Sequence, residues 1–389
     1  MDGGSLTFSF FLIFSGAAVL ATAALYTRQP MLIAYIALGA LIGPYGASYI
    51  NNVGLLEDVG HIGIIFLLFL LGLDMQPQSL RSVAKQASVV AIASSLLFFA
   101  IGAAIAFGFG FTSNECIIIG VAMMFSSTII SIKLLPTTVL HHKHTGELIV
   151  GLLLIQDLIA IFVLIVLLSG SGGQFDYAML LRAMLALPLL AVGALLFVRY
   201  VLLALIARFD RFHEYIFLLA LGWCLGMAEL AALAGLSAEI GAFTAGIVLA
   251  TSPISQFIAL NLRPLRDFFL VLFFFALGAR FDTSMLADIL LPTLLLTAAM
   301  IVVKPLAFRG LLRASREQRA LSWSVGFRLG QNSEFSLLIA YVATSTLLIG
   351  KEASHLIQAT AILTFLISTY IVIFNFPTPI AVSDKLRRD

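Results

Sequence analysis

The sequence predicts an all-α integral membrane protein with about thirteen transmembrane helices, and two observations support this fold class. Apolar residues make up 61% and charged residues 11% of the 389-residue chain, against about 45–50% and about 25% in soluble globular domains. Apolar stretches of about 20 residues, the length that crosses the hydrocarbon core of a bilayer, recur along the whole chain between short polar turns. This repetition excludes a signal peptide followed by a soluble domain.

The expected spans follow these stretches in chain order. They cover approximately residues 6–26, 31–47, 59–74, 87–110, 114–134, 147–169, 178–204, 214–233, 236–252, 265–280, 285–306, 321–348 and 354–376. Loops rich in Lys and Arg stay cytoplasmic. With the N-terminus outside, 17 of the 22 basic residues fall in inner loops or in the C-terminal tail. The outer ends keep only Arg182, Arg280 and Lys351, so we expect the N-terminus outside and the C-terminus inside.

The order of the spans predicts one transmembrane domain built from two repeats. If the span at 178–204 is a linker helix, two six-span halves remain, at about 6–169 and 214–376. We expect the single domain to cover residues 1–389, with no soluble regulatory domain in this chain.

Polar residues interrupt the fifth span of each half. They are Ser126, Ser127 and Thr128 in the first half, and Gln331, Asn332, Ser333 and Glu334 in the second. Paired interruptions at corresponding positions indicate a binding site in inverted-repeat membrane proteins, because unwound backbone offers carbonyls and half-helix ends add their dipoles. For the first interruption alone, ordinary helix packing by small residues is the alternative.

Asp157 is the residue least compatible with a bilayer. It lies near the middle of the span at 147–169, and Gln156 is its only polar neighbour within a turn. An ionisable group at a helix centre costs about 2.5–3.5 kcal/mol on insertion scales, so an ionised carboxylate there needs a cation, a proton or a basic partner. A carboxylate that holds either H⁺ or a metal cation is the minimal device for exchange. A structural ion pair with Lys304 is the alternative.

Two basic residues, Lys304 and Arg328, also fall within or at the edge of spans. We expect Pro305 to break the helix after Lys304 and to leave the ammonium beside irregular backbone inside the bundle. Snorkelling of Lys304 to the cytoplasmic surface is the alternative. Glu239 follows the short turn between the eighth and ninth spans. It either lines an access funnel from the outside or is an interfacial residue.

Other chemistries leave no signature in the sequence. It has no phosphate-binding glycine loop, zinc-protease helix or nucleophile elbow in a suitable context, and no long basic tract that would indicate nucleic acid. The cluster HHKHTGE at 141–147 matches no metal-ligand spacing, and we interpret it as a solvated inner loop that can respond to pH. We therefore expect neither an enzyme nor a metal or cofactor site.

Several motifs carry a resemblance to a known family. They are GALIGPYG (39–46), FLLFLLGLDMQP (66–77), FSSTIISIKLL (125–135), LLLIQDLIAIF (152–162), SAEIGAFTAGIVLA (237–250), FFFALGARFD (273–282) and LGQNSEFSLLI (329–339). In this order and spacing they resemble the monovalent cation/proton antiporter-2 family over essentially the whole chain. The pair Gln156-Asp157 looks like the potassium-efflux (Kef-type) branch, whereas sodium-exchanging electrogenic members typically show Asp-Asp there.

The resemblance implies an elevator-type antiporter with two crossed, interrupted helices, as in sodium/proton antiporters. Asp157 would be the shared cation and proton site, beside Gln156. Thr128 and Ser127 would lie at the first crossing, Asn332, Ser333 and Glu334 at the second, and Lys304 would be the basic partner. Beside these we expect Ser126 at the ion site, Gln331 as a support of the second crossing and Arg328 as a further basic partner. A homodimer formed outside the crossing bundle and a location in the inner membrane of a bacterium are also implied.

Two departures limit what the resemblance implies. Kef-type proteins usually continue into a cytoplasmic nucleotide-binding domain, so such a domain or subunit is expected as a partner, without its gating ligand. The motif QNS at 331–333 replaces the more usual QGS and adds an amide near the site. The expected function is exchange of protons for K⁺, with Na⁺/H⁺ exchange on the same scaffold as the nearest alternative. A gated cation channel is a more distant one, because the sequence has no loop that resembles a selectivity filter.

Overall fold

We analysed a computed structural model of the chain. The residues that it describes are 6–50, 62–63, 65–66, 68–70, 72–73, 84–135, 144–168, 170–171, 174–175, 177–209, 211–234, 236, 238–252, 254–279 and 281–378. Seven helices within these residues are long and apolar enough to cross a membrane, and shorter apolar helices accompany them. The predicted all-helical membrane fold is therefore confirmed, while the total of thirteen spans and the orientation stay predictions.

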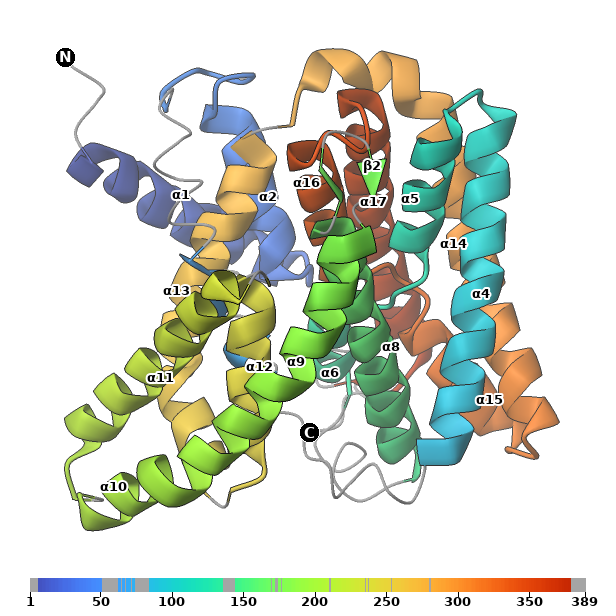
Figure 1. The fold of residues 1–389 in the computed structure, drawn as a ribbon. Helices are drawn as coiled ribbons and strands as arrows, with labels where there is room; N and C mark the ends of the chain where they lie inside the picture. Colours follow the sequence, from blue (N-terminus) through green and yellow to red (C-terminus); the bar gives the residue numbers. More distant parts are fainter. Residues whose placement is uncertain are drawn as a thin grey trace. The chain divides into compact units, whose positions relative to one another are not determined.

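Figure 1 shows the helices and strands of the described residues. In chain order the helices are α1 (Leu6–Tyr26), α2 (Met31–Ile42), α4 (Ala84–Gly108), α5 (Ser113–Met123), α6 (Thr128–Lys133), α8 (His144–Leu168), α9 (Tyr177–Phe197), α10 (Leu203–Arg208), α11 (His213–Leu233), α12 (Ala238–Ala250), α13 (Ser255–Ala279), α14 (Leu286–Ala314), α15 (Arg319–Arg328), α16 (Glu334–Ser345) and α17 (Lys351–Asn375). A π-helical stretch (Val198–Leu202) joins α9 to α10, and a 3-10 turn (Thr283–Met285) precedes α14. Two short antiparallel strands, β1 (Gly170–Ser171) and β2 (Gln174–Phe175), follow α8.

Two predicted boundaries were wrong. Helix α14 does not break at Pro305 but continues to Ala314, because neighbouring groups in a membrane bundle can satisfy the carbonyl that a proline frees. Helix α13 begins at Ser255, ten residues before the predicted start of its span. Its first half is amphipathic, with Ile258 and Leu262 buried and Leu260 exposed, so a search for continuously apolar residues missed it.

The chain divides into two compact units, and each unit takes residues from both predicted repeats. Unit 1 comprises residues 1–23, 34–78 and 176–281, and unit 2 comprises 24–33, 79–175 and 282–389. In unit 2, the helix set α4, α5–α6 and α8 comes from the first repeat, and α14, α15–α16 and α17 come from the second. Each set is a long helix, an interrupted helix and another long helix, as an internal repeat requires.

Unit 1 is held together by close contacts between helix backbones. Gly39 of α2 and Gly278 of α13 face each other's helices so closely that a Cβ at either position would overlap backbone atoms across the interface. Gly72 and Gly246 of α12 form a second contact of the same kind. Small residues allow such approach where lipid provides no hydrophobic force between helices. A buried cluster that includes Trp223 fills the space beside α12.

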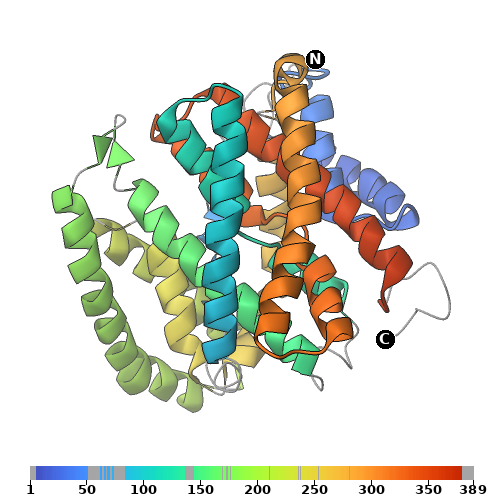
Figure 2. The same cartoon turned by 90° about the vertical axis from the view of Figure 1, so that its right-hand side faces the viewer.

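Unit 2 is a bundle around the two interrupted helices. Helix α4 packs against α5, α8 and α14, and α14 packs against α15 and α17. Figure 2 shows α4 and α14 running side by side. The Phe98 and Phe308 rings meet edge to face between these two helices, with centroids 5.5 Å apart. The bundle thereby places both interruptions among long helices rather than at a lipid-facing surface.

Candidate functional site

The first interruption lies between α5 and α6, at residues 124–127. The Gln156 side chain holds its backbone from α8: Oε1 accepts from the Ser126 amide at 3.1 Å, and Nε2 donates to the Met124 carbonyl at 3.3 Å. The Ser127 hydroxyl caps α6 by accepting from the Ile130 amide at 3.1 Å. Polar groups of an unwound segment in a membrane need such partners, and here α8 supplies them.

The second interruption lies between α15 and α16, at residues 329–333. The Ser333 hydroxyl caps α16 by accepting from the Phe335 amide at 3.1 Å. The Asn332 amide N–H donates to Thr364 Oγ1 of α17 at 3.1 Å. The second interruption is therefore tied to α17, whereas the first is tied to α8.

The two interruptions contact each other directly. The Ser131 hydroxyl of α6 donates to the Arg328 carbonyl at the end of α15 at 3.0 Å. The Ser336 hydroxyl of α16 donates to the Ala122 carbonyl near the end of α5, and the Ser126 hydroxyl donates to a carbonyl of the second interruption at 2.8 Å. Helix α6 thus lies beside α15 and α5 beside α16. The half-helices cross at their interruptions, as the family resemblance implies.

Asp157 lies at this crossing and is 1% exposed. Its carboxylate accepts from the Thr128 hydroxyl, with oxygen–oxygen distances of 3.3 and 3.5 Å. Among the side chains that the structure describes, no basic group lies within 4.0 Å of Asp157. Glu334, in the first turn of α16 and 7% exposed, is a second buried carboxyl group of the crossing helices.

Lys304 bridges the two interruptions instead of pairing with Asp157. The side chain is fully buried, and Nζ donates to the Phe125 carbonyl at 2.6 Å and to the Gln331 carbonyl at 3.2 Å. Its ammonium also lies 5.3 Å from the centre of the Phe98 ring. Neither snorkelling nor an ion pair with Asp157 occurs. The irregular backbone expected beside Lys304 is present, but it belongs to the two interruptions rather than to α14.

Arg328 also donates hydrogen bonds to backbone carbonyls, one of them at the C-terminal end of α6. Its guanidinium is 2% exposed, donates to the Leu134 carbonyl just after α6, and donates to the Pro377 carbonyl at 2.6 Å. Cations near helix C-termini are stabilised by the partial negative charge of the unpaired carbonyls. The two buried basic residues therefore neutralise helix ends.

The side chains of the remaining predicted residues lie outside the described part of the chain. Glu239 lies on α12 in unit 1, and its side chain lies outside the described residues, so its expected place in an access funnel stays a prediction. His141 and His142 also lie outside the described residues. Within the described part of the chain, no group of three His, Cys, Asp or Glu residues could hold a metal ion.

Sequence reasoning missed the hydroxyl residues of α17. Ser368 donates to Gln331 Oε1 at 2.9 Å, and Thr364 accepts from the second interruption. Together with Thr360, which is also buried, they recur every four residues and so line one face of the helix. The recurrence of hydroxyl residues every four positions in an apolar span was the sequence pattern that could have predicted this polar face of α17.

Comparisons with known proteins relate the chain to cation/proton antiporters. The model of the family described as "Sodium/hydrogen exchanger, transmembrane" matches residues 10–375. K(+) efflux antiporter 4 of Arabidopsis thaliana is 28% identical over 92% of this chain and 62% of its own length. K(+) efflux antiporter 5 of the same plant is 30% identical over 86% of this chain and 60% of its own length. The chain thus spans about three fifths of the length of these relatives. They bear out the resemblance inferred from the motifs.

The fold also has a solved counterpart. The structure of the sodium proton antiporter MjNhaP1 from Methanocaldococcus jannaschii at pH 8 superposes with a TM-score of 0.70 and 19% sequence identity. The superposition covers 92% of this chain and 94% of that one. At this identity the match establishes the shared fold and leaves ion and mechanism to the chemistry of the site.

Proposed function

The chain belongs to the sodium/hydrogen exchanger family, and on that premise we propose that it exchanges protons for K⁺ across a membrane, with Asp157 as the shared site. It is a multi-pass membrane protein, and cation/proton antiport is the activity of its family. Two observations favour potassium: the K(+) efflux antiporters among its relatives, and Gln156 at the position next to Asp157. Na⁺/H⁺ exchange on the same scaffold is the alternative.

The observation that carries the proposal is a buried carboxylate with no basic partner in the described structure. Asp157 is 1% exposed, and among the described residues its carboxylate accepts hydrogen bonds from the neutral Thr128 hydroxyl alone. A buried unpaired charge is costly, so Asp157 is stable when it holds a proton or a cation. Either ligand neutralises the same oxygens, and binding of one displaces the other. This competition is the basis of exchange.

The position of Lys304 supports this assignment. A lysine paired with Asp157 would remove the need for an exchangeable ion. Here the ammonium donates instead to the Phe125 and Gln331 carbonyls, which follow the C-terminal ends of α5 and α15. Asp157 faces the start of α6 through Thr128, where the partial positive charge of a helix N-terminus favours an anion.

Unit 2 contains every described residue of the crossing, which supports an elevator mechanism. Hydrogen bonds between the interruptions, such as those of Ser131 and Ser336, join the two sets of helices around Asp157 into one body. We propose that unit 2 carries the ion and that a homodimer forms through unit 1. A regulatory partner and an inner-membrane location remain predictions from the resemblance.

The charge count favours electroneutral exchange. Gln156 cannot titrate, so Asp157 is the one titratable group of the pair. Its carboxylate is neutralised by H⁺ when it crosses in one direction and by K⁺ when it crosses in the other, so the site carries no net charge in either direction. The membrane potential, worth about 2.3 kcal/mol per charge per 100 mV, then does not drive the step. A second proton could come only from Lys304 or Glu334, the other buried ionisable groups nearest the crossing in the described structure.

Asp157→Asn tests the site. The variant should lose exchange in proteoliposomes against Li⁺, Na⁺, K⁺ and Rb⁺ gradients, while it elutes and melts like the folded parent. Glu352→Gln, which removes an exposed carboxylate at the start of α17, is the matched control and should keep wild-type exchange. Retained exchange in Asp157→Asn would refute the proposal, and a response to Na⁺ but not K⁺ would establish the alternative ion.

Currents on a solid-supported membrane test the stoichiometry. Electroneutral exchange predicts no sustained current under an imposed ion gradient, and this method avoids valinomycin, which carries potassium itself. A sustained current that follows the gradient would mean that more than one proton moves per cation.

A further inference from the structure

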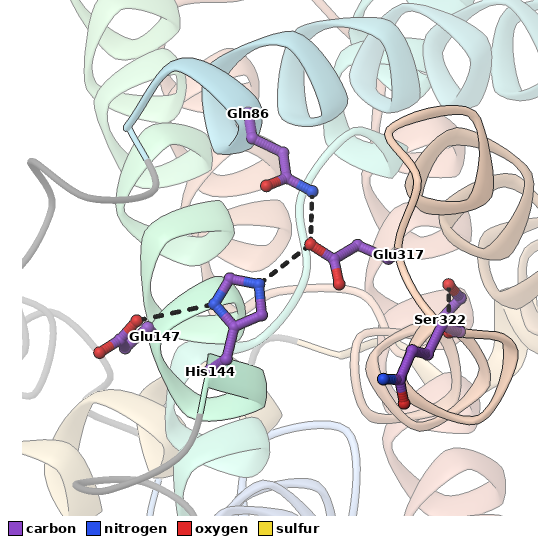
Figure 3. Close-up of polar contacts among 6 residues, drawn as sticks. Gln86, His144, Glu147, Glu317 and Ser322 are labelled. Atoms are coloured by element: carbon purple, nitrogen blue, oxygen red, sulfur yellow. Dashed lines mark hydrogen bonds and ion pairs between the residues drawn. The ribbon is translucent and has the colours of Figure 1, made fainter.

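A second polar cluster lies at one end of unit 2, around Glu317 in the turn between α14 and α15 (Figure 3). Glu317 Oε1 accepts from Gln86 Nε2 of α4 at 2.9 Å and lies 3.0 Å from His144 Nε2 at the start of α8. The other ring nitrogen of His144 lies 3.7 Å from Glu147 Oε2. One carboxylate therefore connects three elements that are distant in sequence.

The backbone around Glu317 holds this carboxylate in place. Arg316 has φ 68°, the left-handed conformation that ends many helices. The Glu317 amide donates to the Leu312 carbonyl at 3.0 Å, and Arg313 Nη1 donates to the Glu317 carbonyl at 3.1 Å. A non-glycine residue at positive φ is uncommon and strained. The turn is thus fixed in a shape that presents Glu317 to α4 and α8.

The cluster joins the two helices that carry the buried charges of the crossing. His144 lies thirteen residues before Asp157 on α8, and Glu317 lies thirteen residues after Lys304, just beyond the end of α14. The predicted topology places both His144 and Glu317 on the cytoplasmic side. A change in their interaction therefore acts on the ends of both helices from one compartment.

We propose that Gln86, His144 and Glu317 form a pH-dependent clasp that ties α4, α8 and the α14–α15 turn together when His144 is protonated, and that slows exchange at acid cytoplasmic pH. Protonation of His144 makes both ring nitrogens donors and adds a positive charge, so its contact with the ionised Glu317 becomes an ion pair as well as a hydrogen bond. A state stabilised in this way is populated at the expense of conformations in which these ends separate. The transport part rests on the proposed function, but the clasp itself does not.

The other charged groups near His144 set the pH range. Glu147 belongs to the same helix and its side chain is 51% exposed, whereas the Glu317 side chain is 14% exposed. Lys85, next to Gln86 on α4, is exposed, and Arg313 is engaged with the Glu317 carbonyl. Partial burial would raise the pKa of Glu317, but its hydrogen bonds with His144 and Gln86 outweigh this effect and hold the pKa below its usual range.

The sign of the pH effect follows from these groups. A carboxyl with a lowered pKa contributes stability above its unfolded pKa and loses it only as the pH falls through its folded pKa. Glu317 is therefore ionised throughout the range in which a histidine titrates, near pH 6.5. The hydrogen bond with Glu317 raises the pKa of His144 above its usual value. The contribution of the clasp is therefore fully present below about pH 6.5 and is lost as the pH rises through that raised pKa.

Thermal unfolding of the purified full chain tests the clasp without transport. Trp323 of α15 lies close in sequence to the turn, and Trp223→Phe leaves it as the single tryptophan reporter. His144→Gln, Glu317→Gln and the double variant should each lower the melting temperature at about pH 5.5 and change it little at about pH 8.0. The double variant should lose no more than the single variants, because the same interaction is removed. Glu147→Gln is the matched control and should have the smaller effect.

The exchange assay tests the regulatory part. At about pH 6, His144→Gln and Glu317→Gln should both exchange faster than wild type by about 1.5- to 5-fold, the range expected for a part-exposed ion pair, and should match it at alkaline pH. Additive melting shifts, or an effect of Glu147→Gln that exceeds that of Glu317→Gln, would refute the clasp. Melting shifts without a change in the pH profile would refute only the regulation. Loss of exchange in Asp157→Asn is independent of both results.

Discussion

The two interrupted helices of unit 2 solve the same physical problem with different partners. The first interruption is held by Gln156, the residue next to Asp157 on α8. The second is held by the hydroxyl groups of Thr364 and Ser368 on α17. Of the buried basic residues, Lys304 donates to carbonyls of both. The first interruption is thus bonded to α8, the helix of the proposed ion site. The second is bonded to α17, which does not carry Asp157.

This difference assigns distinct tasks to the two interruptions. In the first, Ser126 and Ser127 are used for hydrogen bonds within the crossing, which leaves Thr128 to contact Asp157. In the second, Asn332 Oδ1 is buried and has no hydrogen-bond partner among the described residues, and Glu334 adds a carboxylate. We infer that the first interruption holds Thr128 in position to hydrogen-bond the Asp157 carboxylate. The second contributes polar groups that an incoming ion or water can satisfy.

Removing the group shared by both interruptions should have the largest effect. Lys304→Met keeps the length of the side chain but leaves the Phe125 and Gln331 carbonyls without their donor, and each unsatisfied buried group costs about 1–3 kcal/mol. We expect a loss of about 2–5 kcal/mol of stability, and a change in the pH profile of exchange that is larger than the change in maximal rate. Melting curves and exchange assays should be compared with Lys85→Met, an exposed lysine on α4. An unchanged melting temperature and pH profile would exclude a bridging role.

Substituting Gln156 or Gln331 should show that the two interruptions have different effects on cation binding. Gln156→Leu removes two hydrogen bonds from the first, and Gln331→Leu removes bonds to Ser131 and Ser368 from the second. Each should destabilise the protein by about 2–4 kcal/mol, because buried polar groups lose their partners. Only Gln156→Leu should also raise the cation concentration for half-maximal exchange, because it removes the hydrogen bonds that hold the backbone before Thr128, the residue that contacts Asp157. Equal shifts in both variants would contradict the assigned tasks.

The helix caps should give the smallest effects. Ser333→Ala removes the cap of the twelve-residue α16, and Ser127→Ala removes that of the six-residue α6. Losing an N-cap serine costs about 1 kcal/mol, so both variants should fold and melt slightly below wild type. We expect Ser127→Ala to weaken cation affinity more, because α6 begins with Thr128. Ser333→Thr, which retains a hydroxyl, should behave as wild type in the same melting and exchange assays.

Sequence patterns were sufficient for the helices and for the two interruptions. Apolar spans are set by the thickness of the bilayer, so their positions can be read locally, and α1 and α11 end at the predicted residues. The polar groups at 126–128 and 331–334 stand out because a bilayer penalises them. The roles of Asp157 and its neighbours in transport remain predictions that the experiments above address.

The partners of the buried charges could not be predicted in the same way. Lys304 had two plausible partners, Asp157 or exposed carbonyls, and only the packing of α14 against the crossing decides for the carbonyls. The proline after it was misleading, because the cost of Pro305 depends on neighbours that sequence alone does not reveal. The contact of Glu317 with Gln86 and His144 joins residues more than 170 positions apart, so no local pattern indicates it.

The glycine contacts of unit 1 bear on how the protein responds to bilayer thickness. Where Gly39 meets the α13 backbone, and Gly72 meets that of α12, no side chain lies between the helices that could change rotamer and absorb a displacement. A thinner or thicker bilayer is usually accommodated by changes in helix tilt, at a fraction of a kcal/mol per Å of mismatch. Each glycine-linked pair has to tilt as one piece, so lipid chain length should alter the inclination of whole pairs rather than the spacing within them.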